Sequence, residues 1–211
     1  MNSDKAPFKR QALDLHTFLR SRRSVRRFKD EVVDQAILTE VLETATHAPS
    51  AHNRQPWRFA VVTQTGSKQR LGEAMAAEFR RDLEMDHLPE AEIDAQVNRS
   101  RNRIEQAPVV VMLCMDASEM DHYPDEKRRN AERSMAVQST ALAGLQLQLA
   151  AHAEGLSTVW VCAPLFAPAA VRQALDLPDT WEPQGMFFLG YPQGGPKPKV
   201  LKPLDEVVRY S

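Results

Sequence analysis

The sequence predicts a layered domain of the α/β or α+β class. Short runs rich in branched and aromatic residues, typical of strands, alternate along the chain with amphipathic stretches, typical of helices. Neither an internal repeat nor a change of composition marks a linker, so we expect residues 1–211 to form a single domain. A chain of this length can bury roughly 70% of its unfolded surface, which suffices for a core without disulfides or metals.

Four strands are predicted, and one of them is expected to be buried on both faces. Val109 to Met115 is almost continuously apolar, as expected of a strand covered on both faces. The other three strands are Trp57 to Thr63, Thr158 to Cys162 and Gly185 to Leu189. Leu204 to Tyr210 is a candidate for one last strand.

Six helices are predicted from apolar residues that recur on one helical face. Asp34 to His47 has a plausible N-cap in Asp34 and ends before Pro49. The others are Leu13 to Ser21, Ser67 to Met85, Glu90 to Glu105, Glu126 to Glu154 and Pro168 to Leu175. The helix from Glu126 would be about 40 Å long and is apolar over more than one face. Together with a tail that has no obvious partner within the chain, it predicts a large subunit interface.

Composition excludes several classes of protein. The formal net charge of -1 argues against a general nucleic-acid binder. No apolar run approaches the ~20 residues of a membrane span, and the first ten residues contain no stretch of signal-peptide type. Cys114 and Cys162 lie in apolar runs, where a free thiol acts as a small hydrophobe. We therefore expect a soluble, reduced, cytoplasmic protein.

A cluster of arginines follows the first helix. Arg22, Arg23 and Arg26 lie within five residues and enclose Ser24. The planar guanidinium fork matches phosphate oxygens, and a hydroxyl with loop N–H groups would complete a phosphate cradle. The alternative is a solvated basic turn or a patch of salt bridges.

A polar loop between two prolines is the second candidate site. Pro49 and Pro56 restrict a segment that contains Ser50, Asn53 and Gln55, whose groups suit the mixed polar edge of a heteroaromatic ring. His52 in this loop could donate to a substrate. The alternatives are an ordinary helix-to-strand connection and a histidine that is merely polar surface.

Motifs for metal binding or nucleophilic catalysis are absent from the sequence. The six histidines form no metal pattern, and there is no nucleophile elbow, Walker loop or dinucleotide-binding glycine fingerprint. If the protein is an enzyme, a bound cofactor is expected to supply the chemistry.

These features together resemble the FMN-dependent nitroreductases. The likeness covers nearly the whole chain, in order, through Arg22–Phe28, Ala48–Ser50 with Asn53–Phe59, Glu154–Leu156, Gly190–Pro192 and Lys202–Val208. The resemblance implies an α+β fold, a three-layer α/β sandwich whose central mixed sheet is flanked by helices. It also implies an intertwined homodimer with C-terminal strand exchange, in which residues 193–211 reach the partner subunit.

The resemblance assigns residues to FMN. Arg22, Arg23, Ser24 and Arg26 match positions that hold the phosphate and the ring edge. Pro49, Ser50 and Asn53 match the loop that reaches the flavin from the other subunit. Cys162 and Ala163 match backbone groups on the N5 side of the flavin. Lys199 and Lys202 are candidates for a further phosphate contact, although Leu201 stands where many members have arginine.

Within the family, a narrower likeness points to the C-terminal flavin domain of the two-domain γ-glutamyl ligase that builds coenzyme F-420. Matching segments include Ala77–Leu83, Asp121–Asp125, Ala131–Met135 and Trp181–Pro183. In that enzyme the flavin domain reduces a dehydro precursor, and this chain lacks the ligase half. Arg81 and Asp82, in the matching helix, are candidate contacts for such a ligand.

The implied activity is hydride transfer from NAD(P)H to a small organic acceptor of nitro, quinone or dehydro-deazaflavin type, by a ping-pong mechanism. No catalytic side chain is expected, because the flavin carries the hydride. Three alternatives stay open: a flavin- or deazaflavin-binding protein without turnover, a flavin-fragmenting or dehalogenating enzyme on the same fold, and a nucleic-acid-binding module that uses the arginine cluster.

Overall fold

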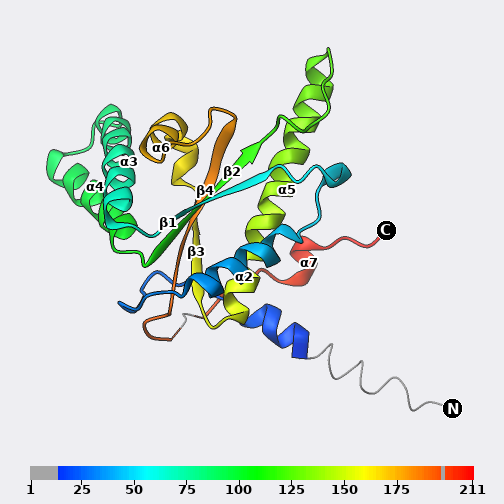
Figure 1. The fold of residues 1–211 in the computed structure, drawn as a ribbon, viewed down its shortest axis with the longest axis horizontal. Coiled ribbons are helices and arrows are strands. Elements are labelled where there is room, and N and C mark those ends of the chain that lie inside the picture. The colour runs from blue at the N-terminus through cyan, green and yellow to red at the C-terminus, as the bar shows by residue number, and fades with distance from the viewer. Residues whose placement is uncertain (1–13, 196–197) are drawn as a thin grey trace.

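A four-stranded antiparallel sheet forms the centre of the molecule (Figure 1). The computed structural model describes residues 14–195 and 198–211. The strand order is β1-β2-β4-β3, where the strands are β1 (Trp57–Val62), β2 (Val109–Asp116), β3 (Ser157–Val161) and β4 (Trp181–Gly190). All four predicted strands are thus confirmed, and β2 is buried along its whole length.

Helices cover both faces of the sheet and make three layers, as predicted. One outer layer contains α2 (Gln35–Thr46) and α5 (Glu126–Ala153). The other contains α3 (Thr65–Met85), α4 (Glu90–Glu105) and α6 (Pro168–Ala174). Asp34 is the N-cap of α2, and its carboxylate accepts from the N–H of Ala36 at 2.7 Å. A further helix spans residues 14–21; the first residue of the predicted helix, Leu13, lies outside the described residues.

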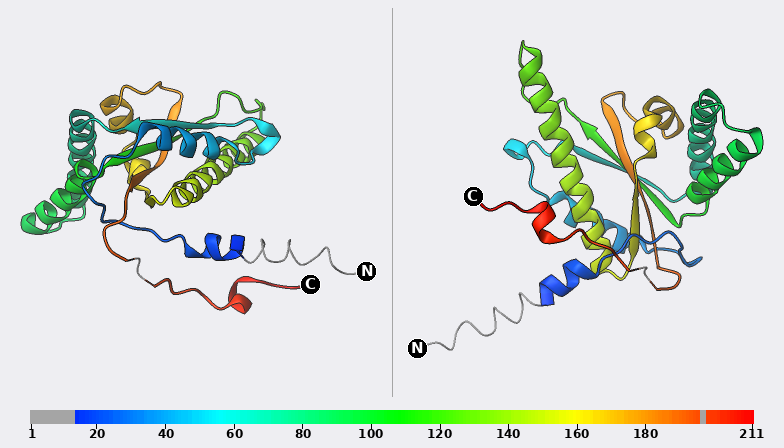
Figure 2. Two further views of the ribbon diagram at one scale, coloured as in Figure 1. Left: turned by 60° about the horizontal axis from the view of Figure 1, so that its bottom comes forward. Right: turned by 180° about the vertical axis from the view of Figure 1, so that it is seen from behind.

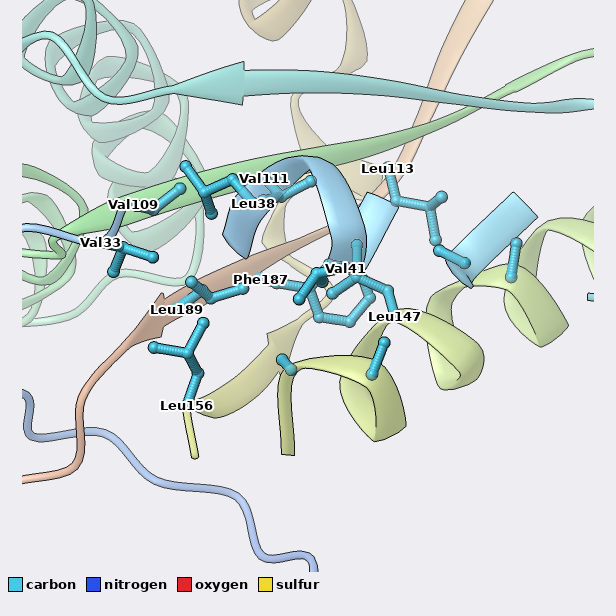
Figure 3. Packing of buried hydrophobic residues seen from close by; sticks show 14 of the residues in the cluster. Val33, Leu38, Val41, Val109, Val111, Leu113, Leu147, Leu156, Phe187 and Leu189 are labelled. Carbon is cyan, nitrogen blue, oxygen red and sulfur yellow. The ribbon is translucent and has the colours of Figure 1, made fainter. Parts of the chain in front are cut away.

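The alternation of side chains along the strands divides the core into two clusters. Val109, Val111 and Leu113 of β2 point toward α2 and α5, where they pack with Leu147 and Phe187 (Figure 3). The intervening residues of β2 pack instead against α3, α4 and α6. No helix among residues 14–195 and 198–211 is long and apolar enough to cross a membrane.

The expectation of a mixed sheet is wrong for the four strands of this chain. The helical hairpin of α3 and α4 starts and finishes at the same end of the sheet. The strand β2 therefore begins opposite the end of β1, with Val62 paired to Val110. The long helix α5 carries the chain from β2 to β3, and β4 lies antiparallel between them. Within the described residues, parallel pairing is limited to an isolated bridge between Ser24 and Thr158.

The strand β4 is longer than predicted because a bulge admits a proline. Pro183 lies within the strand, where proline argues against a central position. The register shifts between Leu113 and Cys114, so that these residues pair with Gly185 and Pro183. The bulge leaves Gln184 outside the ladder and allows the strand to begin at Trp181.

The prediction of a last strand is also wrong. Leu204–Val207 forms the short helix α7, with Pro203 at its N-cap and Asp205 and Glu206 in its first turn. The physical reason is that a strand needs a partner, and residues 198–211 are exposed along their length. The tail runs away from the sheet in both views of Figure 2. Strand exchange with a second copy therefore stays a prediction.

Asp116 at the end of β2 ties three segments together. Its carboxylate accepts hydrogen bonds from Ser118 N at 3.0 Å, Ser118 Oγ at 2.7 Å and Thr180 Oγ1 at 3.2 Å. The guanidinium of Arg58 lies 3.7 Å away. Burial alone would raise the pKa of Asp116, but these hydrogen bonds, with a smaller contribution from Arg58, lower it below the ordinary value of 3.8.

We expect Asp116→Asn to lower the free energy of unfolding by about 1–2 kcal/mol at neutral pH, because it removes charge-assisted hydrogen bonds. The folded-state pKa is lowered, so the stabilisation by the carboxylate is complete above 3.8 and is lost as the pH falls through the folded-state pKa. Denaturant unfolding of both proteins at neutral pH and at about pH 3 measures this difference. An equal difference at the two pH values would contradict the assignment.

Candidate functional site

The segment of residues 22–28, called here the arginine segment, follows the free edge of β3. Val25 N donates to Thr158 O at 3.0 Å, and Lys29 N donates to Tyr191 O at 2.9 Å. These backbone bonds hold the segment in an extended form across the ends of β3 and β4. The side chains of Ser24 and Arg26 are left exposed.

Arg22 is positioned by the C-terminal part of α5. Its Nη1 donates to Gln148 Oε1 at 3.4 Å, and Thr158 Oγ1 donates to the same oxygen at 3.3 Å. The preceding helix is anchored nearby, where Phe18 stacks on His152 with ring centroids 5.0 Å apart. Burial, and after it the charge of Arg22, lowers the pKa of His152. A largely neutral His152 leaves Arg22 as the local positive charge.

Three arginines line a cavity of about 220 Å³ beside the arginine segment, called here the arginine cavity. Arg26 and Arg27 come from the segment and Arg103 from the last turn of α4. Val159, Val161 and Phe188 contribute apolar surface, and Gln106 and Gln193 contribute amides. Among the described residues, no carboxylate forms an ion pair with any of these three guanidiniums, so their charge is available to an anionic ligand.

A second cavity, of about 410 Å³, lies between α3, α4 and the 3₁₀ helix η2 (Ala163–Phe166); we call it the apolar cavity. Its apolar lining comes from Met75, Phe79, Leu83, Ala163, Phe166 and Ala167. Glu78, Asp82, Asp86, Ser100 and Cys162 also line it.

The apolar cavity brings together three of the predicted site residues: Asp82, Cys162 and Ala163. The expectation that Cys162 acts as a buried hydrophobe is wrong, since its side chain is exposed. The cause is that β3 ends at Val161, so Cys162 caps η2 instead of continuing the strand. Arg81 is outside this lining, and its guanidinium pairs with Glu78.

The two cavities are neighbours along two elements of the fold. Val161 lines the arginine cavity, and the next two residues line the apolar cavity. On α4, Arg103 lines the first cavity and Ser100, about one turn earlier, lines the second. A ligand that spanned both cavities would therefore lie along β3 and η2.

The loop of residues 48–57, called here the proline loop, has a conformation that L-residues rarely adopt. His52, Asn53 and Gln55 have φ values of 51°, 54° and 50°. The loop is held by Ser50 Oγ, which accepts from Gln55 N at 3.1 Å, and by Gln55 Nε2, which donates to Asn53 Oδ1 at 3.2 Å. Backbone strain of this kind clusters at functional sites.

The arginine segment and the proline loop lie at different levels of α5 in one chain. The loop is fixed to α5 by the bond from Ala51 N to Ser139 Oγ at 3.1 Å, whereas Arg22 contacts Gln148. Nine residues of helix separate these contacts by about 14 Å. Figure 2 shows the two regions along the same helix, one near its middle and one near its C-terminal end. Lys199 and Lys202 are exposed in the tail.

Arg27 and Arg103 line the arginine cavity but were not among the site residues predicted from the sequence. The helix α4 carries Arg99, Arg101 and Arg103 in alternation, so spacing alone does not indicate which of them faces a ligand. Arg101 pairs with Glu105 at 3.6 Å, and only the tertiary structure brings Arg103 beside Arg26.

Comparison with known proteins identifies relatives along most of the chain. Residues 19–191 match the model of the nitroreductase family. A predicted NAD(P)H nitroreductase of Bacillus subtilis is 29% identical over 91% of this chain and 91% of its own length. An NADH dehydrogenase of Thermus thermophilus is 30% identical over 93% of this chain and 95% of its own length. A 5,6-dimethylbenzimidazole synthase of Rhodospirillum rubrum is 30% identical over 82% of this chain and 79% of its own length.

Solved structures share the fold. A BluB-like flavoprotein of Clostridium difficile superposes with a TM-score of 0.80 at 21% identity, over 93% of this chain and 98% of its own. A predicted nitroreductase of Desulfovibrio desulfuricans, solved in complex with FMN, superposes with a TM-score of 0.70 at 24% identity, over 93% and 95%.

Proposed function

Because the chain belongs to the nitroreductase family, we propose that it is an FMN-dependent oxidoreductase that passes hydride from NAD(P)H to a small organic acceptor. The observation that carries the proposal is the arginine cavity, where three guanidiniums without carboxylate partners border apolar surface next to Cys162 and Ala163. An anionic, partly aromatic cofactor fits this combination of charge and apolar surface. The fold neighbour solved with FMN supports this cofactor.

The residues of the site have distinct roles in the proposal. Arg22, Arg23 and Ser24 hold the phosphate, since guanidinium and hydroxyl groups bind phosphate oxygens well. Arg26 and Arg103 place positive charge at the polar edge of the ring, where it stabilises negative charge that develops on reduction. The backbone at Cys162 and Ala163 borders the reactive side of the ring. When bound, FMN supplies the hydride chemistry itself.

A second copy of the chain completes the site in this proposal. The proline loop, with Pro49, Ser50, Asn53 and Gln55, is about 14 Å along α5 from the contact of Arg22. Between the two, Leu142 and Leu145 are 43% and 47% exposed on α5. A partner packed over this apolar face would cover it and could bring its own proline loop to the arginine segment. Lys199 and Lys202 would then reach the phosphate from the tail.

The donor and the acceptor use one site in turn, by a ping-pong mechanism. The apolar cavity next to Cys162 offers room for a nicotinamide or for an acceptor of nitro, quinone or dehydro-deazaflavin type. Asp82 lines this cavity, whereas His52 would approach only from a partner. The likeness to the F-420 ligase domain and a cytoplasmic location stay predictions.

The test is to purify the protein, record its absorption spectrum and mix it anaerobically with NADH or NADPH. We expect flavin absorption at about 450 nm that bleaches with the donor and returns when a quinone or nitroaromatic is added. Light scattering should give the mass of a dimer. A flavin that neither donor bleaches would favour a binding protein without turnover, and a protein that binds no FMN would refute the proposal.

A second candidate is fragmentation of the flavin itself, which the similarity to a 5,6-dimethylbenzimidazole synthase favours. The two functions differ in their products. After reduction and exposure to oxygen, simple turnover returns intact FMN, whereas fragmentation consumes FMN and releases a benzimidazole. Mass spectrometry of the small molecules after one reduction and oxygen cycle distinguishes them.

A further inference from the structure

We propose that the apolar cavity selects its ligand by charge: it takes a flat, apolar acceptor that is neutral or cationic and excludes anionic acceptors. The proposal rests on the proposed function, because it defines the acceptor class of the same site. It narrows that function, since a dehydro-deazaflavin that carries acidic groups would be a poor ligand.

The apolar part of the cavity fits an aromatic ligand. A volume of about 410 Å³ lies within the usual range of small-molecule sites. Two aromatic side chains, Phe79 and Phe166, belong to the lining. Phe166 is 77% exposed, so a bound ring could remove apolar surface from water here and would also gain aromatic contact.

Carboxylates place negative charge along the lining of the same cavity. Glu78 and Asp82 lie one turn apart on α3, and Asp86 is the residue that caps the C-terminal end of this helix; all three line the cavity. Glu78 is paired with Arg81. Within residues 14–195 and 198–211, no cation forms an ion pair with Asp82 or Asp86. Two negative charges without an ion-pair partner thus border the apolar surface of the cavity.

The lining of the neighbouring arginine cavity carries positive charge. Arg26, Arg27 and Arg103 attract the anionic end of any ligand, while Asp82 and Asp86 repel it. Val161 of the arginine cavity is followed in the chain by Cys162 of the apolar cavity, where β3 passes into η2. This difference in charge favours neutral or cationic rings in the apolar cavity beside α3, and anionic groups in the arginine cavity beside the last turn of α4.

The experiment compares three naphthoquinones that share one ring system: an unsubstituted one, a sulfonate and a trimethylammonium derivative. Dissociation constants are measured with the purified protein by equilibrium dialysis. We expect the neutral and cationic compounds to bind at least about tenfold more tightly than the sulfonate, with a ratio that falls as salt is added. In the double variant Asp82→Asn, Asp86→Asn the ratio should fall to about threefold or less.

Glu73→Gln is the matched control, because Glu73 is an exposed carboxylate of α3 outside the cavity lining. It should leave the ratio unchanged. Equal affinities in the unaltered protein, an unchanged ratio in the double variant, or the same decrease with Glu73→Gln would each overturn the proposal. The single variant Asp82→Asn repeats the test if the double variant does not fold. These binding constants do not depend on turnover, so failure of the oxidoreductase assignment would appear separately, as a flavin that no donor reduces.

Discussion

Replacing Arg22 and Arg26 together with alanine is expected to raise the dissociation constant of FMN by about a hundredfold or more. Each change removes a charge-assisted hydrogen bond, which is equivalent to roughly tenfold to a hundredfold in affinity. Neither residue belongs to the core. Arg22 makes a long bond to Gln148, and Arg26 is exposed, so the fold should be retained. Quenching of flavin fluorescence in a titration of the apoprotein measures the constant.

Arg99→Ala controls for a general loss of positive charge. Arg99 is an exposed arginine of α4 that lies outside the lining of the arginine cavity. It should change FMN affinity by less than about threefold, because a distant exposed charge is screened by salt. If the double variant retained FMN as tightly as the Arg99 variant, the arginine segment would not be part of the FMN site. Circular dichroism and thermal melting establish that both variants are folded.

The helices and the central strand could be predicted from the sequence because their periodicity is local. Glu90–Glu105 has the predicted bounds, and β2 is buried on both faces, as its continuous run of apolar residues indicated. The errors concern pairing. The antiparallel sheet, the bulge at Pro183 and the helix at Leu204–Val207 depend on what lies beside each segment, and the local pattern of a segment does not indicate its neighbours.

The candidate site also contains residues that the sequence identified and residues that only the tertiary structure identified. The arginine segment was identified because its residues are contiguous, and its phosphate role remains a prediction. Arg103 was missed because it is 77 residues from Arg26 in the chain and is brought to Arg26 only by the packing of α4. Asp82 lines the same cavity as Cys162 and Ala163, and this too results from tertiary packing of segments that are distant in the sequence. The proline loop was singled out for its polar groups, but its positive φ values could not be predicted from non-glycine residues.

Phe187→Ala is expected to lower the free energy of unfolding by about 3–5 kcal/mol, the usual cost of removing a buried phenyl ring. Phe187 is fully buried at 0% exposure, in β4 at the centre of the sheet. Its ring packs edge-on against Trp160, with centroids 4.9 Å apart, and belongs to the cluster between the sheet and α5 (Figure 3). Neighbouring backbone is held by two pairing strands, so the cavity left behind should not collapse. Denaturant unfolding gives the change.

Phe166→Ala removes the same side chain from η2, where it is 77% exposed, and separates stability from binding. Its effect on unfolding should stay within about 0.5 kcal/mol, because little buried surface is lost. Its effect on the neutral naphthoquinone should instead be severalfold weaker binding, since Phe166 lines the apolar cavity. The Phe187 variant, if it is folded at low temperature, should bind that compound normally. A large loss of stability with Phe166→Ala would mean that this ring supports the fold, and unchanged binding would remove it from the acceptor site.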